Sequence, residues 1–480
     1  MSTLNPLTLS GVAAGIAKGE YSALEVTQSC LDAIDRAQER LNCFISLQAE
    51  QALEEAKKAD AHRASGAALG LLHGVPLAHK DMFYREGHIS TCGSMIRADF
   101  KPAITATVMS RLARAGALHL GGLNMAEFAT GPTGHNEHYG ACRNPWNTHY
   151  ITGGSSSGSG SAVAARLVFG ALGSDTGGSV RLPAAACGLF GMKSTQTRIS
   201  RYGVMGLSFS LDNVGPLART ARDCARLFGV IAGADPKDPT CSRYLVADYE
   251  GATREPDIRG LKIGVPKQYF YDRVTAQIKE HLDRSLAVFE DLGAVRVEVD
   301  LPLYEHLGGL GEAIFGVETL ALHRAWIRER PGDYGRQTLA RYLANVAIPA
   351  ADYMASIHAR PRVISTFVKA VFSQCDVLHC PVIPFALPTI EETDLADGPG
   401  FERLLASLTC CTRPINYLAL PSLAVPIGFT ANGLPVSCQL VGRPFSEAPL
   451  FRVGAAYELA TNCSSAAPPS PPPTAPLSTP

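Results

Sequence analysis

The chain has 480 residues and a formal net charge of −1, with 46% hydrophobic and 18% charged residues. This composition supports a large buried core and excludes an intrinsically disordered chain. Because opposite charges nearly cancel, composition gives no electrostatic reason to expect binding to nucleic acid or to an anionic membrane.

The N-terminus and the cysteines indicate an intracellular protein. Residues 1–21 lack the basic start and unbroken apolar stretch of a signal peptide, and no run approaches the ~20 apolar residues that span a bilayer. The 13 cysteines are scattered from Cys30 to Cys463 without a Cys-x-x-Cys pair. We therefore expect a cytoplasmic location and reduced, mostly buried thiols.

The first 120 residues alternate between helix and strand patterns. Apolar residues recur at four-residue steps (Val26, Cys30, Ile34), which predicts a first helix. The patterns then predict a helix over 50–62 and a strand whose apolar residues are 75–78 and which ends near Lys80. A helix over 105–115 and a strand over 117–120 follow.

Residues 123–160 form a long polar segment rich in Gly, Asn, Thr and Ser. A loop of this length inside an apolar chain is usually functional or disordered. Residues 161–172 are almost wholly small and apolar, which predicts a buried helix packed closely on its neighbours.

The second half of the chain also alternates between helix and strand patterns. Residues 261–265, 274–292 and 295–299 predict a strand–helix–strand unit. Further strands are predicted over 377–383, 423–429 and 436–441, with a hairpin turn at Asn432-Gly433. No internal repeat is evident. The tail, 463–480, is rich in Pro, Ser and Ala, so we expect it to be disordered.

Two clusters of Gly and Ser contain the residues best suited to catalysis. They span 153–161 and 173–181. A helix over roughly 159–168 would run out ~15 Å, and a strand over roughly 169–174 would return ~20 Å. The clusters can therefore meet at one edge of the structure, which would make Ser155 and Ser179 neighbours.

The turn Thr176-Gly177-Gly178-Ser179 has the features of an oxyanion hole. Glycines let backbone N–H groups turn toward one point, and such donors stabilise the anion that forms in acyl transfer. Ser179 could attack a carbonyl carbon there, but a serine hydroxyl needs a base. The one histidine near either cluster is His149, for which a structural or substrate-facing position is expected.

Lys80 is a candidate for that base. Burial lowers the pKa of a lysine, and the neutral amine can accept a proton. Ser155 could pass the proton between Ser179 and Lys80. A surface lysine paired with Asp81 is the simpler interpretation, and the residues alone do not exclude it.

Other interpretations of the first cluster have weaker support. Residues 154–158 match the G-x-S-x-G nucleophile elbow, with Ser156 as nucleophile, but the strand needed before Gly154 is weak. A phosphate-binding loop would need a following Gly-Lys-Ser/Thr. A flexible linker is disfavoured by the apolar segment directly after the cluster.

Two groups of residues resemble partial metal sites but lack further ligands at a recognisable spacing. They are Cys375, His379 and Cys380, and His135, Glu137 and His138. No metal is therefore expected at either place.

Several longer motifs, in the same order, resemble those of the amidase signature family. They are 74–81 (GVPLAHKD), 122–128 (GLNMAEF), 144–146 (NPW), 153–165, 173–183, 187–193 (CGLFGMK), 215–220 (GPLART), 433–435 (GLP) and Gln439. The likeness extends to about residue 460. It implies an α/β fold, a single large domain with a central mixed β-sheet covered by helices on both faces. Residues 1–65 would form an N-terminal helical segment packed on a catalytic domain of residues 66–462.

The resemblance also implies roles for individual residues. Lys80 matches the family's catalytic lysine, Ser155 its bridging serine on a cis peptide, and Ser179 its nucleophile. The backbone of Thr176, Gly177, Gly178 and Ser179 matches the oxyanion hole, and Ala129 matches a position that lines the acyl pocket. The family needs no metal or organic cofactor.

Some positions depart from the family's common pattern. They are Ser157, where glycine is frequent, Gly160, where alanine is frequent, His79, where a small or aliphatic residue is usual, and Thr195-Gln196. None removes a catalytic group. Because His79 could touch the substrate, the departures bear on specificity rather than on chemistry.

Together these observations predict an amidohydrolase that cleaves the C–N bond of a small aryl, aliphatic or carbamate-like amide through an acyl-enzyme. Two alternatives stay open: the glutaminase (A) subunit of a tRNA-dependent Asp/Glu amidotransferase, and a non-catalytic binding protein on an amidase fold. The first fits the core motifs, but residues 312–323 lack the Tyr- and Asn-rich stretch expected there. The expected partner is a small-molecule amide, with no nucleic acid and no membrane, and a homo-oligomer stays open.

Overall fold

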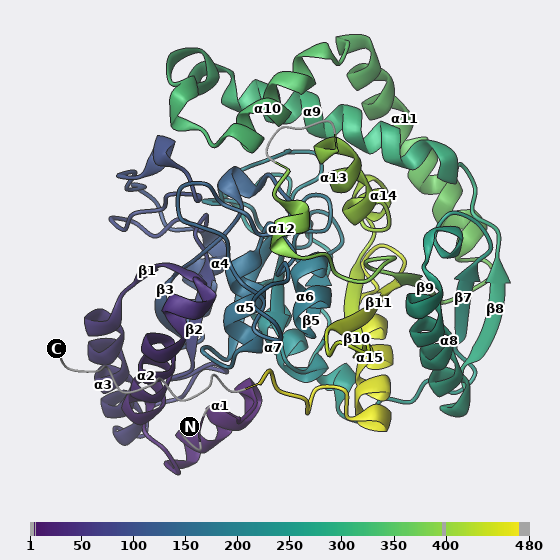
Figure 1. Ribbon diagram of the computed structural model, residues 1–480. Coiled ribbons are helices and arrows are strands. Elements are labelled where there is room, and N and C mark those ends of the chain that lie inside the picture. Colours follow the sequence, from purple (N-terminus) through teal and green to yellow (C-terminus); the bar gives the residue numbers. More distant parts are fainter. Residues whose placement is uncertain (1–3, 5, 396–399, 470–480) are drawn as a thin grey trace.

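A mixed β-sheet runs through the centre of the computed structural model, which describes residues 4, 6–395 and 400–469. Eleven strands in this part of the chain are ordered β1-β3-β2-β4-β6-β5-β10-β11-β9-β7-β8. The neighbours β3, β2 and β4 are parallel, as are β9, β7 and β8, and the other pairs are antiparallel. Helices cover both faces of the sheet (Figure 1), which confirms the predicted fold class.

The strands are β1 (Phe44–Leu47), β2 (Pro76–Lys80), β3 (Leu118–Leu123), β4 (Gly170–Asp175), β5 (Phe190–Lys193), β6 (Asn213–Ala218), β7 (Lys262–Pro266), β8 (Val295–Val299), β9 (Val377–Pro381), β10 (Ser422–Phe429) and β11 (Pro435–Val441). The helices before β9 are α1 (Leu9–Lys18), α2 (Ala23–Leu41), α3 (Ala49–Ala64), α4 (Thr107–Arg114), α5 (Ser157–Ala164), α6 (Arg181–Cys187), α7 (Ala221–Ile231), α8 (Ala276–Asp291), α9 (Tyr304–Glu329), α10 (Arg336–Ala344) and α11 (Ala350–Val371). Those after β9 are α12 (Ile390–Thr393), α13 (Phe401–Thr409), α14 (Arg413–Tyr417) and α15 (Glu447–Thr461).

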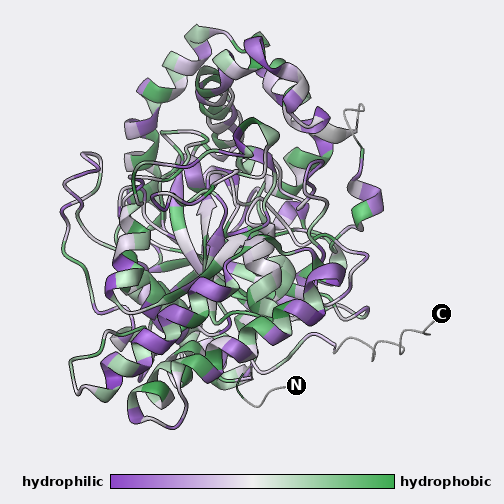
Figure 2. Ribbon diagram, turned by 90° about the vertical axis from the view of Figure 1, so that its left-hand side faces the viewer, coloured by the Kyte–Doolittle hydropathy of each residue, from purple (hydrophilic) through white to green (hydrophobic). Residues whose placement is uncertain are grey.

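Local chemistry explains where the N-terminal helices begin and how they are joined. Helix α2 starts at a capping box, in which the Ser22 hydroxyl accepts from the N–H of Glu25 at 3.0 Å and the Glu25 carboxylate accepts from the N–H of Ser22 at 2.8 Å. Asp60 on α3 accepts from the first N–H groups of α2 at 2.7 and 3.0 Å. Hydrophobic and hydrophilic faces alternate around such helices (Figure 2), as expected for helices that cover a sheet.

The predicted strand–helix–strand unit is confirmed as β7-α8-β8, with β7 and β8 paired in parallel. The predicted hairpin is also confirmed, since β10 and β11 pair antiparallel on either side of Asn432-Gly433. Gly433 has a φ of 77°, a conformation that glycine adopts without steric cost.

The structure corrects two expectations. The apolar run 161–172 is not one helix, because α5 ends at Ala164 and β4 begins at Gly170. Periodicity alone does not distinguish a buried helix from a strand that is buried on both faces. The N-terminal segment 1–65 is also not purely helical, because β1 pairs with β3 and forms an edge of the sheet.

The remaining expectations concern the cysteines and the tail. All thirteen cysteines are free thiols, and all but Cys410 and Cys463 are buried. Residues 463–469 contain no helix or strand, and residues 470–480 of the tail lie outside the described residues. Within the described ranges, no helix has the length and apolar character needed to cross a membrane.

Candidate active site

A buried lysine and two serines meet where the parallel strands β2 and β4 end. Lys80 is the last residue of β2, and Ser174 lies one residue before the end of β4. The Lys80 Nζ lies 2.6 Å from the Ser155 Oγ and 2.8 Å from the Ser174 Oγ. Lys80 is only 1% exposed. The structure therefore brings two of the predicted catalytic residues into direct contact.

Asp81 does not pair with this lysine. Its carboxylate accepts hydrogen bonds from the backbone N–H of Thr91 at 2.8 Å and from the Thr91 hydroxyl at 2.5 Å. Both Lys80 and Asp81 are buried. The interpretation of Lys80 as a surface lysine is therefore wrong.

The surroundings of Lys80 favour the neutral amine. Burial lowers its pKa from 10.5 to about 7, although the charges of Asp212 and Asp175 act in the opposite direction. A lysine with this pKa is partly deprotonated near neutral pH, and its lone pair can then accept a proton from an adjacent hydroxyl.

Backbone hydrogen bonds on either side of the Gly154–Ser155 bond hold Ser155 in place. The Gly154–Ser155 bond is cis. The Gly154 N–H donates to the carbonyl of Pro132 at 2.6 Å, and the Ser155 carbonyl accepts from the N–H of Ala126 at 3.1 Å. The rival nucleophile Ser156 is buried and its hydroxyl donates to the Ser174 carbonyl at 3.4 Å. Because the Ser156 side chain is buried and its hydroxyl donates to this carbonyl, Ser156 lacks the exposed position that a nucleophile elbow requires.

Ser179 lies in the turn that follows β4 and is partly exposed. It lines a small cavity of about 30 Å³ together with Thr176, Gly177 and Ala129. Four of the predicted site residues therefore share one cavity. The N–H of Gly178 donates to Asp175 Oδ1 at 2.9 Å, so this amide is already engaged within the loop. An oxyanion bound here would depend on the other amides of the turn.

A buried ion pair holds this turn in place. Arg181 donates to the Asp175 carboxylate from Nε at 3.1 Å and from Nη2 at 3.0 Å, and both side chains are fully buried. The same guanidinium donates to Gln439, Asn416 and the Thr412 carbonyl at 2.8, 2.6 and 3.0 Å. Although burial alone would raise it, the pKa of Asp175 is lowered from 3.8 to about 2, chiefly by Arg181.

Replacing Asp175 with asparagine is expected to lower the free energy of unfolding by about 3–5 kcal/mol, because Arg181 would keep a buried charge without its carboxylate. Urea denaturation followed by circular dichroism would measure the change. Asp257→Asn is a matched control, since Asp257 pairs with Arg259 at the exposed surface and such pairs contribute little. Equal stability of the two variants would contradict the proposed role of the pair.

Four residues of the site were not predicted from the sequence, and three of them come from distant segments. Ser174 could have been found from the sequence, because it lies in the second Gly/Ser cluster. Asp212, whose carboxylate accepts from the Thr176 hydroxyl at 2.6 Å, had no such sequence signal. Arg341 and Arg413, which line the cavity at Ser179, also lie outside every recognised motif.

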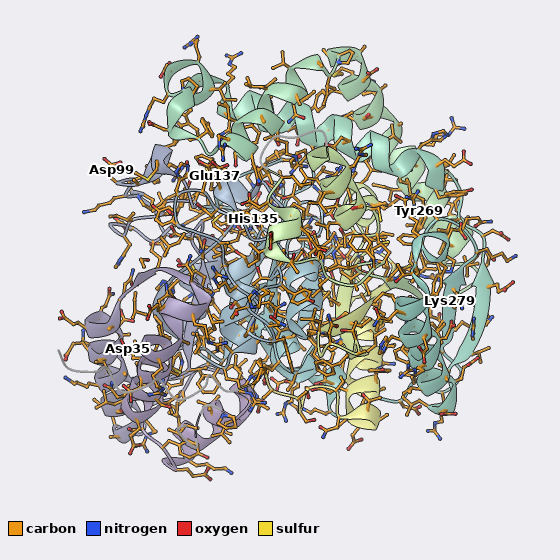
Figure 3. The ribbon with its side chains drawn as sticks, in the orientation of Figure 1. Asp35, Asp99, His135, Glu137, Tyr269 and Lys279 are labelled. Atoms are coloured by element: carbon orange, nitrogen blue, oxygen red, sulfur yellow. The ribbon has the colours of Figure 1, made fainter. Side chains whose placement is uncertain are left out.

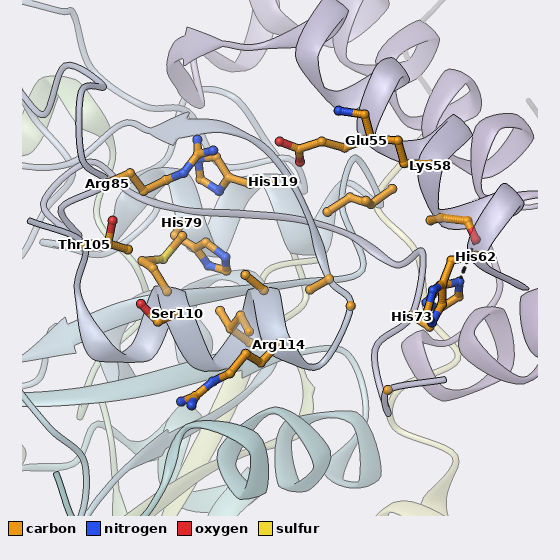
Figure 4. Close-up of a pocket in the computed structure, with 18 of the residues that line it drawn as sticks. Glu55, Lys58, His62, His73, His79, Arg85, Thr105, Ser110, Arg114 and His119 are labelled. Carbon is orange, nitrogen blue, oxygen red and sulfur yellow. Dashed lines mark hydrogen bonds between the residues drawn. The ribbon is translucent and has the colours of Figure 1, made fainter. Parts of the chain in front are cut away.

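A cavity of about 790 Å³ is drawn in Figure 4, and its lining residues include none of Lys80, Ser155, Ser174 and Ser179. His79 lines it, stacked on His119 with ring centroids 5.4 Å apart, and the His79 Nδ1 accepts from the N–H of Leu172 at 3.0 Å. Successive side chains of a strand point to opposite faces, so His79 and Lys80 face opposite sides of the sheet. The structure therefore places His79 on the other side of the sheet from the predicted catalytic residues.

The two partial metal sites are occupied by other interactions. The His135 Nε2 lies 2.9 Å from the Thr393 hydroxyl, and the His138 Nε2 lies 3.0 Å from the Glu127 carboxylate (Figure 3 labels His135). His379 is hydrogen-bonded to two hydroxyl groups. Within residues 4, 6–395 and 400–469, no three His, Cys, Asp or Glu side chains are grouped to hold a metal ion.

Known proteins are similar to this chain over nearly its whole length. The family model described as Amidase matches residues 25–451. The A subunit of the glutamyl-tRNA(Gln) amidotransferase of Chloroflexus aurantiacus is 38% identical over 485 residues, which cover 96% of this chain and 98% of that protein.

Two solved structures are similar over nearly the whole chain. One is from a vestigial protein complex that reveals the evolutionary origins of an s-triazine catabolic enzyme, with a TM-score of 0.89, 33% identity and coverage of 95% of this chain and 99% of that one. The other is a bacterial aryl acylamidase of the amidase signature family, with a TM-score of 0.86, 25% identity and coverage of 96% and 98%.

Proposed function

This chain belongs to the amidase signature family, and from that premise we propose that it hydrolyses the carbon–nitrogen bond of a small amide. The observation that carries the proposal is the buried Lys80 amine, 2.6 Å from the Ser155 hydroxyl at the end of β2. A lysine there with a pKa of about 7 can act as a general base near neutral pH.

The proposed chemistry uses three reacting side chains and a fourth that orients one of them. Neutral Lys80 donates one N–H to Ser174, which directs its lone pair toward Ser155. Lys80 takes the Ser155 proton while Ser155 takes the proton of Ser179, and the Ser179 Oγ attacks the carbonyl carbon. Backbone N–H groups of the turn 176–179 other than that of Gly178 stabilise the oxyanion. The same two groups return the proton to the leaving amine, and water then hydrolyses the acyl-enzyme.

A second candidate is the glutaminase subunit of a tRNA-dependent amidotransferase, which would act with partner subunits. Near full-length identity of 38% to a protein named as such a subunit favours it. This likeness in sequence is closer than the 25% identity to the aryl acylamidase. The catalytic step is amide hydrolysis in both candidates, so the geometry of Lys80 and the serines supports them equally.

A panel of amides, esters, carbamates and glutamine, assayed with the purified full chain, would test the proposal. We expect amine or ammonia release from at least one amide and labelling of Ser179 by a fluorophosphonate. Glutamine as the best substrate, or co-purification with a partner subunit, would favour the second candidate. Absence of both turnover and labelling would refute the proposed function and leave the non-catalytic interpretation.

A further inference from the structure

Two adjacent cysteines lie in the link between α13 and α14 (Figure 1). The Sγ atoms of Cys410 and Cys411 are 3.7 Å apart, which is hydrogen-bonding contact for sulfur. Cys411 is fully buried, whereas Cys410 is one of the two partly exposed cysteines. A thiol that solvent reaches therefore touches a second thiol that solvent does not reach.

Cys410 has the surroundings of a reactive thiol. The Arg273 Cζ lies 4.3 Å from the centroid of the Tyr269 ring, and the Tyr269 hydroxyl donates to the Cys410 carbonyl at 3.0 Å. The hydrogen bond with Cys411 and the positive charge of Arg273 lower the pKa of Cys410, although burial acts in the opposite direction. Because the thiolate is the reactive form, an oxidant attacks a cysteine of this kind first.

The same link is in contact with the turn that holds Ser179. The Thr412 hydroxyl donates to the carbonyl of Gly177 at 2.6 Å. A Cβ added at Gly178 would meet the Thr412 side chain, so the turn packs directly on this residue. Thr409, which precedes the two cysteines, lines the cavity at Ser179. A displacement of the cysteine backbone would therefore reach the proposed oxyanion hole.

We propose that Cys410 and Cys411 are a redox-sensitive site, in which a hydroperoxide forms a reversible disulfide that lowers the amidase activity. This inference rests on the proposed amide hydrolysis at Ser179. The two sulfur atoms must close from 3.7 Å to a bond of about 2.05 Å. Because Cys411 is packed in the core, closing moves the backbone that carries Thr412, and a misplacement of about 1 Å near a catalytic group can cost a factor of about 10².

The reaction consumes one hydroperoxide for each disulfide. The Cys410 thiolate attacks the terminal oxygen of the hydroperoxide, whose O–O bond breaks; a sulfenic acid forms, and the departing alkoxide takes up the proton that Cys410 released. The Cys411 sulfur then attacks the sulfenic sulfur, so that the S–S bond forms, the S–O bond breaks and water leaves with the Cys411 proton. Two electrons pass from the two thiols to the peroxide.

A disulfide between neighbouring residues is expected to be reduced easily. Adjacent Cα atoms lie about 3.8 Å apart across a trans peptide, which is closer than the roughly 4.4–6.8 Å of ordinary disulfides. Strained disulfides have higher reduction potentials and belong to the labile, regulatory class. The pair therefore suits a reversible response rather than a structural crosslink.

Treatment of the reduced full chain with hydrogen peroxide tests the proposal in two measurements. Peptide mapping after denaturation and alkylation should show Cys410 joined to Cys411. In parallel, kcat/KM for any amide that the untreated chain hydrolyses should fall by roughly 10- to 100-fold and recover with dithiothreitol. Recovery separates the disulfide from methionine sulfoxide and from sulfinic acid, which dithiothreitol does not reduce.

Two variants assign the effect to the pair. Cys410→Ala is expected to keep its activity in peroxide, because the attacking thiolate is absent. Cys463→Ala is the matched control, since Cys463 is the other partly exposed cysteine and burial raises its pKa to about 12. This variant should lose and recover activity as the wild type does. If Cys410→Ala does not fold, the peptide map and the recovery of the wild type still decide the outcome.

Two results would overturn the inference and leave amide hydrolysis standing. One is a sulfinic acid at Cys410 without a disulfide, and the other is a disulfide that leaves kcat/KM unchanged. Failure of the proposed function would appear differently, as no turnover of any amide and no labelling of Ser179 before peroxide is added. The regulatory role would then fall with it, although the peptide map would still report the disulfide.

Discussion

Replacing Ser179 with alanine is expected to reduce kcat/KM for any amide that the wild type hydrolyses by roughly 10⁴- to 10⁶-fold. The variant would lose the only atom proposed to bond covalently to the carbonyl carbon. Folding should be retained, since Ser179 is partly exposed in a turn that the Asp175–Arg181 pair holds. Initial rates of amine release and fluorophosphonate labelling would measure the loss.

Ser156→Ala is the matched control for this experiment. Ser156 lies in the first Gly/Ser cluster, and its hydroxyl donates to a backbone carbonyl. We expect its effect on kcat/KM to be smaller than that of Ser179→Ala by a factor of at least about 10³. The reverse order, with Ser156→Ala inactive and Ser179→Ala active, would show that the nucleophile elbow interpretation is correct.

Replacing Lys80 with arginine is expected to lower kcat/KM by roughly 10³- to 10⁵-fold, although the positive charge is kept. Arginine has a pKa above about 12 and cannot accept a proton near neutral pH. Lys80→Met should lose a similar factor, because both variants remove the base. An arginine variant that retained most of the activity would show that Lys80 acts by its charge and not as a base.

The pH profile of the wild type tests the same role. Because the neutral amine is the active form and its pKa is about 7, kcat/KM should rise with pH, reach half its maximum near pH 7 and fall as the pH is lowered further. Circular dichroism over the same range would separate this effect from unfolding. This control matters because burial also lowers the pKa of Lys193 to about 7, and Lys193 donates to the carbonyls of Ser194 and Leu420. A flat profile from pH 5.5 to 8.5 would exclude Lys80 as the titrating base.

The candidate site separates into parts that the sequence predicts and parts that it does not. Lys80, Ser155, Ser179 and the turn between Thr176 and Ser179 lie in compact motifs with unusual Gly and Ser content. The strand–helix–strand unit of β7, α8 and β8 follows from apolar periodicity, which is a property of neighbouring residues. Periodicity alone predicted the strand–helix–strand unit, whereas the roles of the site residues were predicted from the likeness of their motifs to those of the family.

The tertiary structure alone decided which groups surround those residues. Composition and periodicity did not distinguish a Lys80 buried against Ser174 from one paired with Asp81. Arg181 reaches partners 231 to 258 positions away, and the cavity at Ser179 is completed by arginines from α10 and α14. Periodicity shows which face of an element is buried, but not which distant element packs against it. The lining of the cavity at Ser179 depends on that packing.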